Sequence, residues 1–180
     1  LTAERELPPQ IHTILRQTPA TVHPMALMRT AVSALGMLDP EAQDISREAS
    51  LRKTLRLLAK APTILAAGHR YAQGLEALSP DTDLSHAENL LYMILGKKPA
   101  ASATAAMNTS LILYMEHGYN ASTFAARVVA STLADLHAAV VAGISALVGP
   151  LHGGANEAAM AMFIDIGSPD NAREYVLDLL

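Results

Sequence analysis

Residues 121–148 read ASTFAARVVASTLADLHAAVVAGISALV, and this stretch decides the fold. Its apolar residues recur with helical spacing throughout, and only Arg127 and Asp135 carry a formal charge. One straight helix of this length would span about 40 Å, at 1.5 Å per residue. The segment beginning at Ser131 instead has the pattern of a new helix start, with Thr132 as the cap and Asp135 in the first turn. We therefore predict two helices that fold back on one another and join near Ser131.

Proline and glycine residues divide the rest of the chain into further helices. Pro24 suits the first turn of a helix, and Gly36 indicates the end of that helix. Pro62 is expected to break or restart the helix around it. The pattern predicts an all-α fold, with further helices over 11–16, from 24 to the region 36–40, and over 45–60, 63–78, 84–95, 101–116 and 153–166, and with a last helix that starts at Ser168-Pro169-Asp170.

The composition excludes several classes of protein. The 180 residues are 51% hydrophobic, 17% charged and only 4% aromatic, which excludes disorder and favours an aliphatic, helical core. A net charge of −4 disfavours nucleic acid as a partner. Cysteine is absent, which excludes disulfides and thiolate metal sites and is typical of a cytoplasmic protein. Residues 136–156 carry no charge but include several glycines and two histidines, so a buried helix is favoured over a membrane span.

Histidines are the main titratable candidates for chemistry. No pair has a metal-ligand spacing such as H-E-x-x-H, so we predict no metal site. Four histidines are expected to be surface or capping residues of helices, namely His12, His69, His86 and His137. His117 and His152 differ, because they flank the predicted helical hairpin and should meet at one of its ends.

His152 lies in the segment 149–157, GPLHGGANE, and directly precedes the helix predicted over 153–166. Its neighbours have little bulk, so a substrate could approach the imidazole and the backbone closely. The positive end of the helix dipole opposes protonation, so the imidazole is expected to stay neutral. A neutral imidazole can donate an N–H to a developing enolate without giving up its proton. A glycine-rich connector between helices is the alternative interpretation.

His117 lies in the segment 116–123, EHGYNAST, at a corner between two predicted helices. Such a corner exposes backbone N–H groups, which suit an anionic ligand. Asn120 shares the corner, and Ser122 and Thr123 are available to cap the next helix. The alternative is an ordinary capped turn.

Four segments, in order along the chain, resemble the citrate synthases and the closely similar 2-methylcitrate synthases. They are HPMALMRTAVSALGMLDP at 23–40, DLSHAENLLYMILGKKP at 83–99, EHGYNASTFAARVVASTLADLHAAV at 116–140 and GPLHGGANE at 149–157. The resemblance covers essentially the whole chain and implies a mostly helical, two-domain enzyme that works as a homodimer. Residues 1–151 would then belong to the large dimerisation domain, and residues 152–180 would begin the smaller domain.

The resemblance also implies a reaction, the condensation of acetyl-CoA with oxaloacetate to citrate and CoA. Acetyl-CoA is a substrate there, and no cofactor or metal is implied. His152 matches the histidine that stabilises the acetyl-CoA enol, and His117 matches the histidine that binds oxaloacetate. The residues expected to support the site are Asn120, Gly153, Gly154 and Asn156.

Some groups of the family's site have no match among these 180 residues. They are a second histidine in a G-x-G-H-R-V-Y-like segment, an aspartate base and the arginines that bind the oxaloacetate carboxylates. The chain begins at Leu1, and its last helix has no closing signal before Leu180, so we expect a fragment without the C-terminal part, inactive by itself. A 2-methylcitrate synthase using propionyl-CoA and a short, non-catalytic paralogue that serves as a helical dimeric binding protein are the alternatives.

Overall fold

A computed structural model describes residues 1–179, and over this range the chain is helical without a β-strand, as the sequence predicts. Nearly every predicted helix is present. The α-helices of this range are α1 (Pro9–Gln17), α2 (Pro24–Leu38), α3 (Arg47–Ala72), α4 (His86–Leu95), α5 (Ala101–Leu113), α6 (Ala121–Ala130), α7 (Leu136–Leu147), α8 (Gly154–Ile166) and α9 (Ala172–Asp178), with short 3-10 turns at Thr2–Glu4 and Pro169–Asn171.

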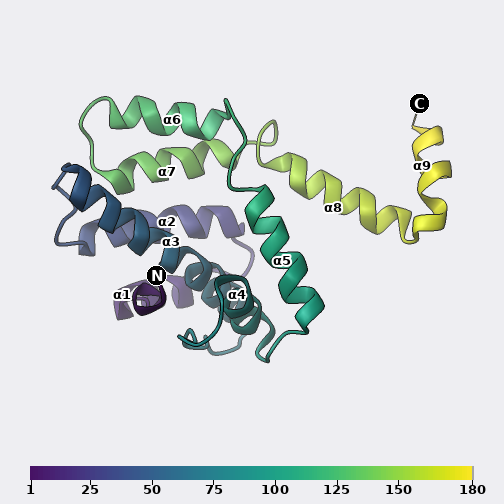
Figure 1. Cartoon of the computed structure of the whole chain (residues 1–180), viewed down its shortest axis with the longest axis horizontal. Helices are drawn as coiled ribbons and strands as arrows, with labels where there is room; N and C mark the ends of the chain where they lie inside the picture. The colour runs from purple at the N-terminus through teal and green to yellow at the C-terminus, as the bar shows by residue number, and fades with distance from the viewer. Residues whose placement is uncertain (180) are drawn as a thin grey trace.

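The helices are stacked in layers (Figure 1). Helix α7 lies between α6 and α2, and α2 packs in turn on α1 and α3. Helix α4 packs on α3, and α5 packs on α4. The buried core comes from α1, α2, α3 and the segment before α1, and consists of Leu7, Ile11, Leu15, Ala31, Val32, Ala34, Leu35, Leu57, Ile64 and Ala67. Apolar residues of α7 pack against this core, so the α6–α7 pair is anchored to it through α7.

The predicted helical hairpin is confirmed, but its predicted cap is wrong. Helix α6 ends at Ala130, and Leu133 adopts a left-handed conformation with φ of 62° in the turn. This turn delays the start of α7, so the Asp135 carboxylate becomes the cap and accepts the backbone N–H of Ala138 at 3.1 Å. The Thr132 hydroxyl instead donates to the backbone carbonyl of Val129.

The expected helix break at Pro62 is also wrong. Helix α3 continues through Pro62, because Leu57 and Ile64 on either side of the proline are both buried in the core. Burial of this face outweighs the backbone hydrogen bond that the proline removes. Gly36 lies inside α2, where α7 comes close: a Cβ on Gly36 would lie 2.9 Å from the Cβ of His137. The helix ends two residues later at Leu38, within the predicted region 36–40, and the glycine permits the contact with α7.

Helix α8 runs away from the layered body and carries α9 at its far end (Figure 1). None of its residues is buried, and Phe163 and Ile164 are largely exposed. The predicted start at Ser168 is confirmed, since its hydroxyl accepts the N–H of Asp170 and a 3-10 turn leads into α9. No helix within residues 1–179 combines the length and the apolar character that crossing a membrane requires.

Candidate active site

The hairpin brings His117 and His152 to the same end, as the sequence predicts. His117 lies in the turn before α6, and His152 lies in the turn between α7 and α8. Their ring centroids are 6.3 Å apart, and the ring planes are nearly perpendicular at 84°. His117 is exposed and His152 is half-buried, so one small ligand could reach both imidazoles from solvent.

Ser122 holds the His152 ring, a role that the sequence analysis missed. The Ser122 Oγ lies 2.8 Å from Nε2 of His152. The cap of α6 is Asn120, whose Oδ1 accepts the N–H of Thr123 at 2.7 Å, so Ser122 is not needed as a cap. Because Ser122 engages Nε2, a ligand would meet Nδ1 of His152. Nothing in the sequence links these residues, which are 30 positions apart.

The glycines and Asn156 fasten the turn between α7 and α8. A Cβ on Gly153 would lie only 1.9 Å from the backbone oxygen of Leu147, so this position excludes a side chain. Gly154 has more room, since its Cβ would lie 3.5 Å from Pro150. The Asn156 Oδ1 accepts the hydroxyl proton of Tyr114 at 3.0 Å, which ties α8 to the end of α5. Supporting roles for Asn120, Gly153, Gly154 and Asn156 in catalysis stay predictions.

Of the histidines expected at the surface or in caps, His137 departs most from the prediction. It is only 3% exposed, and Gly36 of α2 covers it. His12 bonds Tyr71 at 2.9 Å, and His69 bonds Gln73 within its own helix. The sequence does not show the burial of His137, because the residue that covers it lies in a helix a hundred positions earlier. Among residues 1–179 no group of histidine and acidic side chains is arranged to hold a metal ion.

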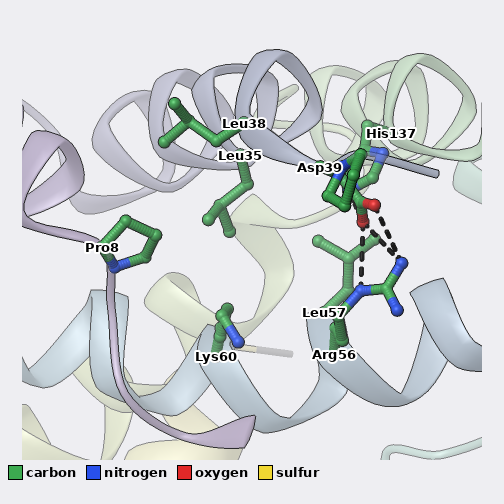
Figure 2. Close-up of a pocket in the computed structure, with 9 residues that line it drawn as sticks. Pro8, Leu35, Leu38, Asp39, Arg56, Leu57, Lys60 and His137 are labelled. Atoms are coloured by element: carbon green, nitrogen blue, oxygen red, sulfur yellow. Dashed lines mark hydrogen bonds and ion pairs between the residues drawn. The ribbon is translucent and has the colours of Figure 1, made fainter. Parts of the chain in front are cut away.

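His137 belongs to a charged cluster at the start of α7, the end of that helix that is away from His152. Figure 2 shows it beside Asp39, which the Arg56 guanidinium binds at 2.8 Å. The Nε2 of His137 lies 3.6 Å from Asp39, and its Nδ1 lies 3.6 Å from Asp135. Burial lowers the pKa of His137, and its two carboxylate neighbours only partly oppose that effect. Burial would raise the pKa of Asp39, but the Glu41 N–H and Arg56 hold that pKa below its ordinary value.

The fold and the site thus define an all-helical protein with two facing imidazoles at the open end of a helical hairpin. A family model described as "Citrate synthase, C-terminal domain" matches residues 1–180. The chain belongs to the citrate synthase family.

Similar proteins carry two enzyme names. The chain is 46% identical over 176 residues to a citrate synthase from Deinococcus radiodurans, covering 98% of the chain and 47% of that protein. It is 45% identical over 174 residues to a 2-methylcitrate synthase from Mycobacterium tuberculosis, covering 97% of the chain and 44% of that protein.

Solved structures of the family have the same fold. The citrate synthase from Pyrobaculum aerophilum matches with a TM-score of 0.87 at 43% identity, covering 96% of this chain and 45% of that one. The enzyme from Thermoplasma acidophilum, solved as a ternary complex with carboxymethyl coenzyme A and oxaloacetate, matches with a TM-score of 0.87 at 30% identity, covering 98% and 46%. The chain therefore spans about half the length of the relatives that it matches.

Proposed function

We propose that this chain contributes part of the active site of a citrate synthase, which condenses acetyl-CoA with oxaloacetate to give citrate and CoA. The observation that carries the proposal is the facing pair of His117 and His152 at the end of the hairpin, 6.3 Å apart between ring centroids. At that spacing the rings lie edge to face, so one small ligand beside them can contact both. Membership of the citrate synthase family supports the reaction.

In the proposed mechanism His152 stabilises the enol of acetyl-CoA. For Nδ1 to donate to the enol oxygen, the neutral ring must carry its proton on Nδ1 and accept a hydrogen bond at Nε2, and the Ser122 hydroxyl is placed to donate that hydrogen bond. The serine thereby fixes both the tautomer and the orientation of the ring.

His117 binds oxaloacetate in the proposed mechanism. Its exposure at the corner before α6 leaves the imidazole accessible, and the first backbone N–H groups of that helix face the same corner. Asn120 supports the corner by capping α6. The aspartate base, the second histidine and the arginines of the family's site have no match in these 180 residues. We therefore expect no turnover from the 180-residue chain alone.

The proposal includes the domains and the partner. Residues 1–151 form part of a large dimerisation domain, and residues 152–180 begin the small domain, a division supported by the way α8 leaves the body (Figure 1). A homodimer is supported by the exposed apolar side of α6, where Phe124 and Val128 line a groove of about 1090 Å³. The cysteine-free sequence supports a cytoplasmic location. The proposal includes no cofactor, because acetyl-CoA is a substrate.

A 2-methylcitrate synthase that uses propionyl-CoA is the second candidate. It is favoured by a specific observation, since the identity to a 2-methylcitrate synthase, 45%, nearly equals that to a citrate synthase, 46%. Release of CoA from each of the two thioesters, measured with oxaloacetate present, separates the candidates. The protein encoded by the complete reading frame should be assayed beside the 180-residue chain.

Variants of the protein encoded by the complete reading frame test the roles of the two histidines. His152→Ala should lower kcat by about 10²- to 10³-fold, the range for losing one hydrogen-bond donor to a developing negative charge. His117→Ala should raise the KM for oxaloacetate. His69→Ala is the matched control, because His69 is exposed on α3 and bonds Gln73 of its own helix. Equal activity of all three variants and the wild type would contradict the assignment, and lack of any CoA release would favour a non-catalytic binding protein.

A further inference from the structure

One contact joins the first turn of α8 to the start of α2, two segments that are far apart in the sequence. The Nε2 of His23 lies 2.8 Å from Oε1 of Glu157, across a separation of 134 residues. His23 is the residue that caps α2, and Glu157 lies in the first turn of α8. Glu157 follows His152 by five residues, so the contact lies beside the turn that presents the proposed catalytic imidazole.

The cap fixes the direction of the hydrogen bond to Glu157. The Nδ1 of His23 accepts the backbone N–H of Met25 at 3.2 Å, so it carries no proton in this arrangement. The neutral ring must then carry its proton on Nε2, which donates to the Glu157 carboxylate. One imidazole thus caps α2 with one nitrogen and binds α8 with the other.

The His23–Glu157 contact lies at the edge of a cavity and not within a packed interface. A cavity of about 440 Å³ lies between the two segments and is lined by His23, Met25, Pro150, Gly153 and Glu157 among others. No residue of α8 is buried, and no helix runs alongside it (Figure 1). Packing therefore contributes little to the direction of α8 on this side, and a polar contact becomes important for it.

We propose that His23 is a positioning residue, which acts through Glu157 to hold the first turn of α8 and thereby the His152 turn. The catalytic relevance of this contact rests on the proposed function, whereas the contact and its mechanical effect do not. Both side chains are at least half exposed, so the expected effect on local opening is modest.

Two substitutions at position 23 separate the cap from the contact with Glu157. In His23→Asn the amide oxygen replaces Nδ1 and keeps the cap, but the side chain is too short to reach Glu157. In His23→Gln an amide N–H replaces Nε2 and can still donate to Glu157. Glu157→Ala removes the contact from the other side and leaves the α2 cap intact. His69→Asn is the control at an exposed histidine with no contact to α8.

Amide hydrogen exchange and the ring nitrogen NMR signals of His152 are measured on the 180-residue chain without substrate. We expect His23→Asn and Glu157→Ala to speed exchange in the first turns of α8 by about two- to fivefold, the effect of losing one exposed polar contact, and to shift the His152 signals. The double variant should show no more than either single variant. His23→Gln should behave like the wild type, and α6 and α7 should be unchanged.

The outcome is decisive in either direction. Wild-type exchange and His152 signals in His23→Asn would overturn the proposal, as would equal damage in His23→Asn and His23→Gln. Because none of these measurements needs turnover, they stand even if the complete protein releases no CoA. If that protein is active, His23→Asn should lower kcat per folded molecule with little change in KM. Unchanged exchange in α6 and α7 then distinguishes this effect from a general loss of folding, which lowers the apparent kcat in the same way.

Discussion

Gly153 and Gly154 are adjacent, but their surroundings place different demands on a side chain. The Cβ of Gly153→Ala would meet the backbone oxygen of Leu147 at 1.9 Å, and a backbone atom cannot turn aside as a side chain can. We expect this variant to lower the free energy of unfolding by about 1–3 kcal/mol, as overpacking does. Gly154→Ala meets Pro150 at an ordinary 3.5 Å and should change stability by less than about 0.5 kcal/mol. Urea denaturation of both variants measures the difference, and equal stabilities would contradict the close contact.

His137 makes stability depend on pH in a window of its own. Burial lowers the pKa of His137 below the ordinary 6.5, so below about pH 6.5 the unfolded chain binds a proton that the folded chain resists. The free energy of unfolding should therefore fall as the pH falls from 7 to 5. His137→Phe removes the titrating group and should flatten this part of the curve.

Two further groups give the pH experiment its controls. Burial also lowers the pKa of His86, so a smaller slope should remain in His137→Phe. The pKa of Glu41 is lowered to about 2 by hydrogen bonds from Arg52 and Arg56, so its contribution is lost only at more acid pH, between about 4.5 and 2. Denaturation curves measured at each pH unit separate the windows. An undiminished slope between pH 7 and 5 in His137→Phe would show that the residue does not titrate as its burial requires.

At the scale of elements, the start of α7 depends on Asp135. Its carboxylate accepts the Ala138 N–H, whereas Thr132 makes only a hydrogen bond back to α6. Asp135→Ala should lower the free energy of unfolding by about 1 kcal/mol, the usual effect of losing a helix cap. Thr132→Ala, three residues earlier, should stay within about 0.5 kcal/mol of the wild type. Thermal unfolding of the two variants is the measurement. A larger loss of stability in Thr132→Ala than in Asp135→Ala would show that Thr132 is the cap after all.

Helices were predictable where local signals and burial agree, and mispredicted where tertiary contacts override local signals. Pro24 suits a helix start because it has no N–H that would need a partner, and Ser168 suits one because its hydroxyl accepts the N–H of Asp170. Pro62 was misjudged, because α3 is buried on both sides of the proline, and the contact of α7 with Gly36 was not foreseen. A single sequence contains no information on which helices will touch at those points.

At the scale of the whole molecule, the dimer proposal makes a prediction about mass. Phe124 is 73% exposed and Val128 50% exposed on the side of α6 that faces away from α7, and a second copy would cover both. Light scattering should give twice the chain mass for the wild type and a single chain mass for Phe124→Glu. Leu55→Glu, at an exposed leucine of α3, is the matched control and should stay dimeric. A folded wild-type monomer would contradict the proposal.

The site was predictable to the level of its segments but not of its contacts. The strings around His117 and His152 stand out because histidine, glycine and asparagine gather at helix ends, and the hairpin prediction places them together. Ser122, Tyr114 and His23 were missed as partners of the second segment. Each comes from a different helix or helix end, so only the assembled chain shows what it touches.

Because no residue of α8 is buried, the rest of the fold contributes little to the formation of this helix. An isolated helix of its 13 residues is marginal in water, because nucleation is costly and few backbone hydrogen bonds follow. The local equilibrium between helix and unfolded chain is thus close to even for this segment, and burial of Phe163 and Ile164 would shift it toward the helix. A surface that covers these two side chains also stabilises the helix, so that association and helix formation are coupled.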